Sequence, residues 1–146
     1  MEMNIEERKK LRDEVLGEID LPIFRAKKID SNEYIQGSFI NHYYDTVNLT
    51  RYQNVIFINN IQFFEIDIKT LAISLPRMLD KNGKKIFASL DSKDGIGGDI
   101  INCYLSSNQD KPNRTNQVVK YYKPFFLGLK SYDIDSYYSL EIIGIK

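Results

Sequence analysis

The chain has 146 residues, of which 42% are hydrophobic and 27% charged, a composition typical of a folded domain and not of a disordered segment. Its 20 Lys and Arg residues balance 20 Asp and Glu residues, and a net charge of zero argues against a dedicated binder of duplex DNA or of an anionic membrane surface. Cys103 is the only cysteine, which excludes an intrachain disulfide and a cysteine-based zinc site.

The single cysteine favours a reducing compartment. The first twenty residues contain no apolar segment of the kind found in secretory signals. No run of the sequence approaches the roughly 18 apolar residues that a membrane-spanning helix needs. We therefore expect a soluble, cytoplasmic protein without a membrane partner.

The first predicted element is a helix over residues 4–18, which consists of good helix formers and stops near Gly17. Its apolar residues form only a narrow stripe: Ile5, Leu11, Val15 and Leu16. A thin stripe contributes little to a monomeric core. We therefore expect this N-terminal segment, residues 1–20, to dock on its own domain or on a second subunit.

From residue 21 to residue 146 the pattern becomes one of short strands, rich in β-branched and aromatic residues and separated by turns. Hairpins are predicted around Asp30-Ser31-Asn32 and around Asn59-Asn60, the second of which joins strands over residues 54–58 and 61–68. Further strands are predicted over residues 70–75, 84–90, 98–105, 118–129 and 137–146, with Pro76 ending the first of these and a polar loop over 106–117. The pattern predicts one mainly-β domain, either a small barrel or bent antiparallel sheets.

The stretch Asp80-Lys81-Asn82-Gly83 is predicted to form a tight turn, because asparagine and glycine both tolerate positive φ. A calcium loop beginning at Asp80 is excluded, since Lys84 occupies a ligand position. The glycine-rich run that ends in Gly98-Asp99 is expected to make a second structural turn. A strand follows it, whereas a phosphate-binding loop leads into a helix.

The best catalytic candidate is the pair Asp67 and Lys69, which would share one face of a strand and, with Asp45, resemble the carboxylate and lysine set of Mg²⁺-dependent nucleases. The same D/E-x-K spacing also occurs at residues 7–9 and 91–93, so chance alone supplies it repeatedly. Neither Cys103 nor His42 lies in a nucleophile motif. We expect no enzyme activity, no cofactor and no metal.

A binding surface has more support than a catalytic one. Lysines flank the turn at residues 80–83, and lysines alternate with aromatic residues in the segment KYYKPFF. Such a mixture can contact phosphates and stack on bases, or can bind peptides. The candidate ligand-binding residues are Lys81, Lys84, Lys85, Tyr121, Tyr122 and Lys123.

Four segments in this order resemble the motifs of the YopX-like family of phage and prophage proteins. They are FRAKKIDSNEYIQG at 24–37, EIDIKTL at 65–71, DKNGKKIF at 80–87 followed by GDII at 98–101, and LEIIGIK at 140–146. Two departures are an apparent insertion at residues 88–97 and the replacement of the family's G-Q-[FY]-T-G-L run by LAISLPRMLD. The resemblance implies a β-rich fold associated with a small SH3-like barrel, over residues 21–146.

The resemblance also implies a phage or prophage origin and residence in a bacterial host cell. Together with the absence of a coherent catalytic set, it favours an accessory protein that binds a macromolecule without transforming it. A protein partner or self-association is the first expectation. Nucleic-acid binding is the alternative, and an Mg²⁺-dependent nuclease using Asp67 and Lys69 is a weaker one.

Overall fold

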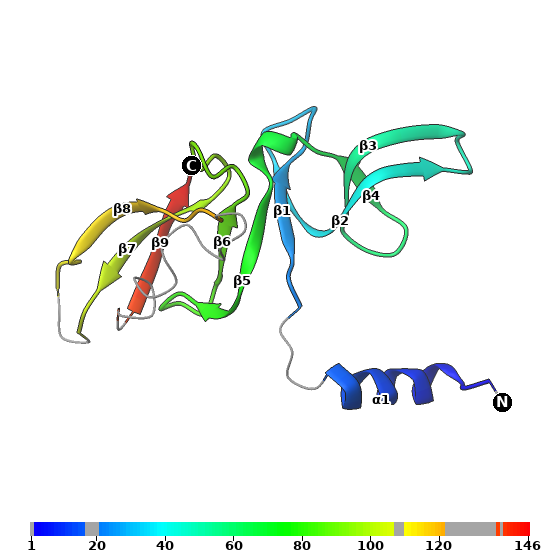
Figure 1. The fold of residues 1–146 in the computed structure, drawn as a ribbon, viewed down its shortest axis with the longest axis horizontal. Helices are drawn as coiled ribbons and strands as arrows, with labels where there is room; N and C mark the ends of the chain where they lie inside the picture. Colours follow the sequence, from blue (N-terminus) through cyan, green and yellow to red (C-terminus); the bar gives the residue numbers. More distant parts are fainter. Residues whose placement is uncertain (1, 17–20, 107–109, 122–136, 138) are drawn as a thin grey trace.

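The structure is a computed structural model that describes residues 2–16, 21–106, 110–121, 137 and 139–146. The described residues form one α-helix, a short 3₁₀ helix and two antiparallel sheets, so the predicted mainly-β class with an N-terminal helix is confirmed (Figure 1). Among the described helices, none has the length and apolar content needed to cross a lipid bilayer.

Helix α1 spans Ile5–Leu16, close to the predicted limits. The side chain of Asn4 starts it by accepting a hydrogen bond of 2.8 Å from the backbone N–H of Glu7. The helix lies apart from both sheets in Figure 1, and its apolar side chains Ile5 and Val15 are 72% and 69% exposed. The helix therefore leaves its apolar stripe without a partner among the described residues.

The larger sheet has six strands in the order β4-β3-β2-β1-β5-β6. Its strands are β1 (Phe24–Lys27), β2 (Tyr34–Asp45), β3 (Thr50–Phe57), β4 (Phe63–Glu65), β5 (Ala72–Leu79) and β6 (Lys85–Ser89). Strands β1 and β2, β3 and β4, and β5 and β6 pair as hairpins, at the three turns that the sequence predicts. Figure 1 shows that β2, β3 and β4 form one end of the molecule, away from β6.

The smaller sheet has three strands in the order β8-β7-β9: β7 (Asp99–Tyr104), β8 (Arg114–Val118) and β9 (Ser139–Ile145). The two sheets do not close into the predicted SH3-like barrel. In the described part of the chain, β4 and β6 remain at opposite ends of the six-stranded order, and β7 pairs with β8 and β9 but not with β6. The fold is thus two bent, open antiparallel sheets.

Two apolar clusters stabilise the sheets. The first joins them, because side chains of β5 and β6 pack on side chains of β7, β9 and the segment after β8: Leu75, Ile86, Ala88, Ile101, Cys103, Val119 and Leu140. The second lies inside the bend of the larger sheet and contains Ala26, Ile35, Ile56, Ile66 and Leu71. Cys103 is fully buried, and burial raises the pKa of its thiol, so it packs as a small apolar residue.

Three predicted strand limits are wrong. The strand predicted to run to Ile68 ends at Glu65, and a short 3₁₀ helix, η1 (Ile68–Thr70), follows it. Strand β5 continues through Pro76, where its pairing with β6 shifts register between Ser74 and Leu79. Strand β8 occupies the end of the predicted polar loop, and most of the predicted strand 118–129 lies outside the described residues.

Two glycines with positive φ allow a test of how the turns are held. Gly83 has φ +81°, and a Cβ added there meets no atom within 4 Å. Gly97 has φ +86°, and a Cβ added there comes within 2.0 Å of the backbone oxygen of Thr70. We expect Gly83→Ala to lose roughly 1–2 kcal/mol, the conformational cost alone. Gly97→Ala should lose at least twice as much, because the backbone of Thr70 must also move. Urea unfolding measures both, and equal losses would contradict the close packing of Gly97.

Candidate ligand-binding groove

The lysine-rich turn between β5 and β6 is a three-residue turn in which only glycine has positive φ. The backbone N–H of Gly83 donates to the backbone carbonyl oxygen of Asp80 at 3.0 Å. The backbone N–H of Asp80 donates to the backbone carbonyl oxygen of Lys84 at 2.8 Å. Gly83 is at φ +81°, whereas Asn82 keeps negative φ. The turn therefore places glycine in the left-handed region and makes no use of the tolerance of asparagine for positive φ.

The carboxylate of Asp80 fixes this turn on strand β9. Its Oδ1 accepts hydrogen bonds from the N–H groups of Asn82 and Lys84, each at 2.9 Å, and its Oδ2 accepts one from Ile142 at 3.3 Å. Burial of the carboxylate opposes its ionised form, but these hydrogen bonds outweigh burial and lower the pKa of Asp80. The N–H of Lys81 also donates to the oxygen of Leu140 at 2.8 Å. The turn is thus held at the edge of the smaller sheet.

A groove of about 540 Å³ lies between this turn and β9, and we refer to it as the basic groove. Lys84 and Lys85 lie along one side, and four consecutive residues of β9, 142–145, lie along the other. The remaining lining residues are Arg25, Gln36, Phe87 and Asp99. Two of the six predicted ligand residues therefore line a common groove.

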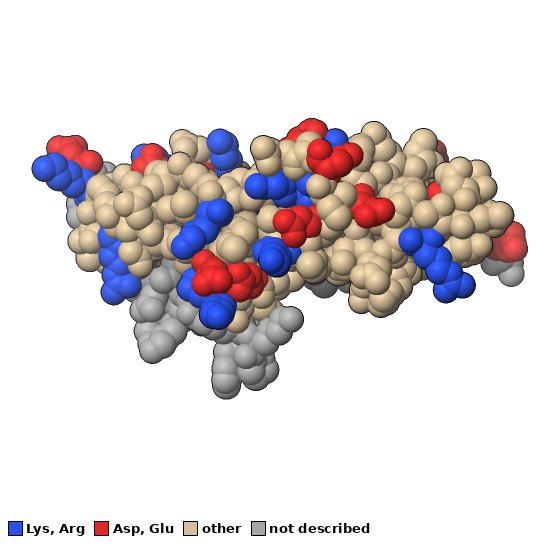
Figure 2. Space-filling view, turned by 90° about the horizontal axis from the view of Figure 1, so that it is seen from above, with Lys and Arg blue, Asp and Glu red and all other residues tan. Residues whose placement is uncertain are grey.

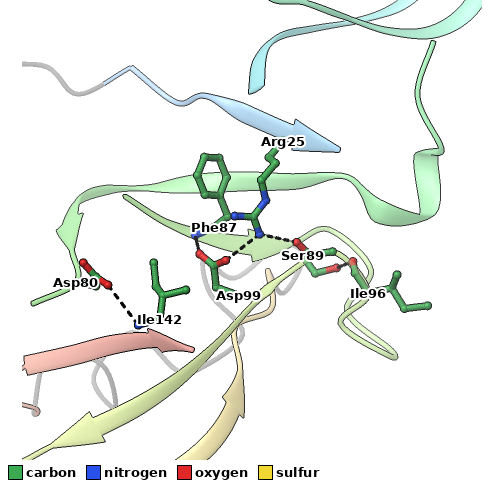
Figure 3. Close-up of polar contacts among 8 residues, drawn as sticks. Arg25, Asp80, Phe87, Ser89, Ile96, Asp99 and Ile142 are labelled. Carbon is green, nitrogen blue, oxygen red and sulfur yellow. Dashed lines mark hydrogen bonds and ion pairs between the residues drawn. The ribbon is translucent and has the colours of Figure 1, made fainter. Parts of the chain in front are cut away.

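An ion pair between Arg25 of β1 and Asp99 of β7 lines the basic groove (Figure 3). The Nη2 of Arg25 lies 2.8 Å from Oδ1 of Asp99 and donates to the oxygen of Gly97 at 2.8 Å. Asp99 accepts a second contact from the N–H of Phe87 at 2.8 Å, and the guanidinium lies 4.4 Å from the centre of the Phe87 ring. The side chains of Arg25 and Asp99 are only 8% and 0% exposed.

Burial raises the pKa of Asp99, although the positive charge of Arg25 opposes this rise. The Nε of Arg25 and the Oδ1 of Asp99 have no partner with hydrogen-bond geometry among the described residues. Oδ1 and Nη2 are close but poorly aligned, so their contact is mainly one of charge. The pair leaves the groove wall uncharged overall at this point.

Lys81, the third lysine of the turn, does not line the basic groove. Its Nζ lies 2.8 Å from Oε2 of Glu141 and 5.3 Å from the centre of the Tyr104 ring. The Tyr104 hydroxyl donates to Glu141 at 3.0 Å. The contact between Lys81 and Glu141 raises the pKa of the lysine and lowers the pKa of the carboxyl. Lys81 is thus paired inside the chain.

The aromatic residues predicted to join the lysines are placed differently. Tyr121 packs against the apolar cluster between the sheets, and its backbone N–H donates to the backbone carbonyl oxygen of Ser89 at 2.7 Å. Tyr122 and Lys123 lie outside the described residues. The described part of the prediction therefore reduces to Lys84 and Lys85 in the groove, with Lys81 beside it.

The glycine-rich loop between β6 and β7 is packed on its surroundings. A Cβ at Gly97 would approach the oxygen of Thr70 to 2.0 Å, and one at Gly98 would approach the oxygen of Val119 to 2.3 Å. The hydroxyl of Ser89 donates to the oxygen of Ile96 at 2.6 Å. Asp99, grouped with Gly98 as a turn residue from the sequence, begins β7 and is the buried partner of Arg25.

The residues of the nuclease alternative do not share a strand. Asp67 precedes η1, where its side chain accepts a hydrogen bond from the N–H of Lys69 at 3.1 Å. Asp45 ends β2 and accepts hydrogen bonds from the N–H groups of Val47 and Asn48. The predicted placement of Asp67 and Lys69 on one strand face is therefore wrong. The described residues contain no group of three His, Cys, Asp or Glu side chains that could hold a metal.

Basic and acidic side chains are interspersed on the face seen in Figure 2 and do not form a continuous basic surface. Comparisons of the chain with protein-family models, curated proteins and solved structures give no match. The resemblance to the YopX-like family therefore stays a prediction, and the function has to be inferred from the chain's own geometry.

Sequence reasoning missed Arg25, Asp99 and the part played by β9. Arg25 lies in the segment FRAKKIDSNEYIQG, but no local pattern links it to a carboxylate 74 positions later in the sequence. The available signal was a charged residue within an apolar strand pattern, as in FRA and GDII. A charge at such a position requires a buried partner.

The buried ion pair gives a prediction for stability. Arg25→Met leaves the carboxylate of Asp99 buried without a positive charge, and we expect a loss of about 3–5 kcal/mol. The double variant Arg25→Met/Asp99→Asn removes both charges while keeping an acceptor for the N–H of Phe87. It should recover part of that loss in urea unfolding. A double variant less stable than Arg25→Met would contradict the coupling of the two charges.

The lowered pKa of Asp80 gives a prediction for pH. A carboxyl whose pKa is lower in the folded state than its ordinary value of 3.8 adds stability above that value, and the added stability disappears as the pH falls through the folded-state pKa. We expect Asp80→Asn to be less stable than the wild type at pH 6 and to approach it in strong acid. Thermal unfolding between pH 6 and pH 2.5 measures the difference, and a constant difference would contradict the assignment.

Proposed function

We propose that the chain is a non-catalytic binding module whose basic groove takes an acidic, extended segment of a protein partner. The order of motifs resembling YopX-like proteins supports a further proposal, that the chain is a phage- or prophage-derived accessory protein of a bacterial host cell. The observation that carries the binding proposal is the pairing of two lysines with an apolar strand across one groove.

The charge of the groove favours an anionic ligand. Arg25 is offset by Asp99 at 2.8 Å, so that pair adds no net charge. Lys84 and Lys85 are the other two basic residues in the groove lining. The hydrogen bond to Asp80 holds the backbone at Lys84, so the fold fixes the point at which this side chain leaves the turn. Carboxylates of a partner would meet the positive charge of the lysines on this wall.

The opposite wall favours a protein ligand over a nucleic acid. Ile143 and Ile145 of β9 are 46% and 37% exposed, and β9 is an edge strand in the described part of its sheet. Phe87, the aromatic residue of the groove, is only 2% exposed and offers no free ring for a base to stack on. An acidic peptide segment with apolar residues can contact both walls of the groove. A nucleotide chain could pair its phosphates with the lysines, but its bases would have no aromatic ring to stack on.

Helix α1 offers a second surface for association. Its exposed apolar side chains Ile5, Leu11 and Val15 contact nothing that buries them in the described chain. Burying such a stripe against a partner helix or a second copy removes apolar surface from water. The helix therefore supports the same conclusion as the groove, that the chain works by association.

The groove is tested with two charged probes, a fluorescein-labelled decaglutamate peptide and a labelled dT₁₂ oligonucleotide. We expect the peptide to bind with an affinity that falls with salt, and Lys84→Ala/Lys85→Ala to weaken it about tenfold, as the loss of two ion pairs implies. Lys9→Ala/Lys10→Ala, which removes the same charge from α1, is the matched control and should bind as the wild type does.

Equal binding by both double variants would overturn the groove as the site. Tighter binding of dT₁₂ than of the peptide, lost with Lys84 and Lys85, would replace the protein partner by a nucleic acid. Thermal unfolding of each variant separates lost binding from lost folding.

Deletion of residues 1–18 tests the second surface. We expect the β sheets to stay folded, because α1 contributes no residue to either apolar cluster. We also expect self-association of the full chain to weaken. Light scattering measures the mass of both forms, and Ile5→Ser/Val15→Ser provides a version with the helix retained. A full chain that is strictly monomeric at high concentration would contradict this prediction.

A further inference from the structure

A second cleft, separate from the basic groove, lies between the β2–β3 hairpin and the glycine-rich loop. Its volume is about 740 Å³, and none of its lining residues is shared with the basic groove. The hairpin contributes Phe39, Asn41 and Asn54, and the loop contributes Asp94 and Ile96. A cleft of this size can bury a ligand of two or three small rings.

Asn41 and Asn54 are the central polar groups of this cleft. They lie directly opposite each other in the register of β2 and β3. Asparagine is disfavoured in strands, and a facing pair in the middle of a hairpin replaces two residues that would support the sheet. Neither side-chain amide makes a hydrogen bond within the described chain. The fold therefore gains nothing from these amides, and both remain open to a ligand.

The backbone beside the pair is also unusual. His42, which follows Asn41, has φ +63° within β2. Positive φ is uncommon for residues other than glycine and is found at ligand sites more often than elsewhere. Tyr43 does not line the cleft but packs on Phe57 and Phe63, with ring centres 5.0 Å away in each case. The turn of the backbone at His42 thus keeps Asn41 in the cleft and directs the next ring to a different cluster.

The loop side of the cleft is held in place, and the charged residues in the cleft lining are Lys69, Asp91 and Asp94. The Oδ1 of Asp91 accepts hydrogen bonds from the backbone N–H groups of Lys93 and Asp94, and these bonds stabilise the conformation of the loop. Gly95 and Gly97, both at positive φ, shape the loop against its surroundings. Lys69 from η1 faces the same cleft as Asp94, and the two charges are opposite in sign.

We propose that this cleft binds a neutral oligosaccharide. A sugar hydroxyl both donates and accepts hydrogen bonds, and so do the side-chain amides of Asn41 and Asn54. Asp94 adds an acceptor and Lys69 adds a donor, while Phe39 and Ile96 provide apolar surface for the C–H face of a sugar ring. The carboxylates of Asp91 and Asp94 oppose a phosphate or another anion. The lining therefore fits an uncharged polyhydroxylated ligand better than a nucleotide.

The experiment is ligand-observed NMR followed by calorimetry on the full chain, with maltotriose, cellotriose and chitotriose as neutral probes. The dinucleotide dTdT serves as a charged probe. We expect at least one trisaccharide to bind and dTdT not to bind. Asn41→Val/Asn54→Val should raise the Kd of that sugar at least tenfold. It should also unfold at the wild-type temperature or above it, because valine suits a strand better than asparagine does.

Gln53→Ala is the matched control, since it removes a carboxamide from the strand position next to Asn54 without touching the cleft lining. It should bind the sugar as the wild type does. No binding of any of the three sugars by the wild type would overturn the proposal, and so would binding that survives the double substitution. Binding of dTdT in preference to the sugars would do the same.

Discussion

The ion pair of Arg25 and Asp99 is the constraint on which the arrangement of the two sheets depends. Arg25 belongs to β1 of the larger sheet and Asp99 to β7 of the smaller one, and both are almost completely buried (Figure 3). Removing two charges from water is costly, and their attraction offsets the cost only when the groups meet closely. Here they meet at 2.8 Å, and Phe87 and Gly97 supply further contacts. A different docking of the sheets would leave a charge buried alone, so the pair contributes more to a unique arrangement than to net stability.

The position of this pair also determines where both candidate sites lie. Arg25 and Asp99 line the basic groove, so the lysines of the turn face a wall whose own charge is already balanced. The hydrogen bond from Arg25 to Gly97 holds the glycine-rich loop, and the far side of that loop forms one wall of the second cleft. The two sites therefore share a structural support without sharing a lining residue. The pairing of Lys81 with Glu141 adds a separate tie between the turn and β9.

Features that depend on neighbouring residues could be predicted from the sequence, and features that depend on distant ones could not. The helix, the hairpins and the turn at Gly83 follow from local patterns of helix formers, turn residues and alternation. The assignment of β6 and β7 to different sheets does not, because the glycine-rich loop between them reads equally well as a hairpin. The sequence favours a turn at Asp99 for the same reason, since its partner Arg25 lies 74 positions earlier in the chain.

The sequence indicates the two candidate sites in different ways. Lysines at a turn are compatible with simple solvation, and only the structure shows that Lys84 and Lys85 face a groove while Lys81 is paired with Glu141. Asn41 and Asn54 contradict the preference of their strands, but that conflict becomes visible only when the register shows them opposite each other. A local rule broken without a compensating contact inside the chain is expected where a sequence is selected for binding and not for stability. On that ground the asparagine pair is a stronger sign of a ligand than Lys84 and Lys85.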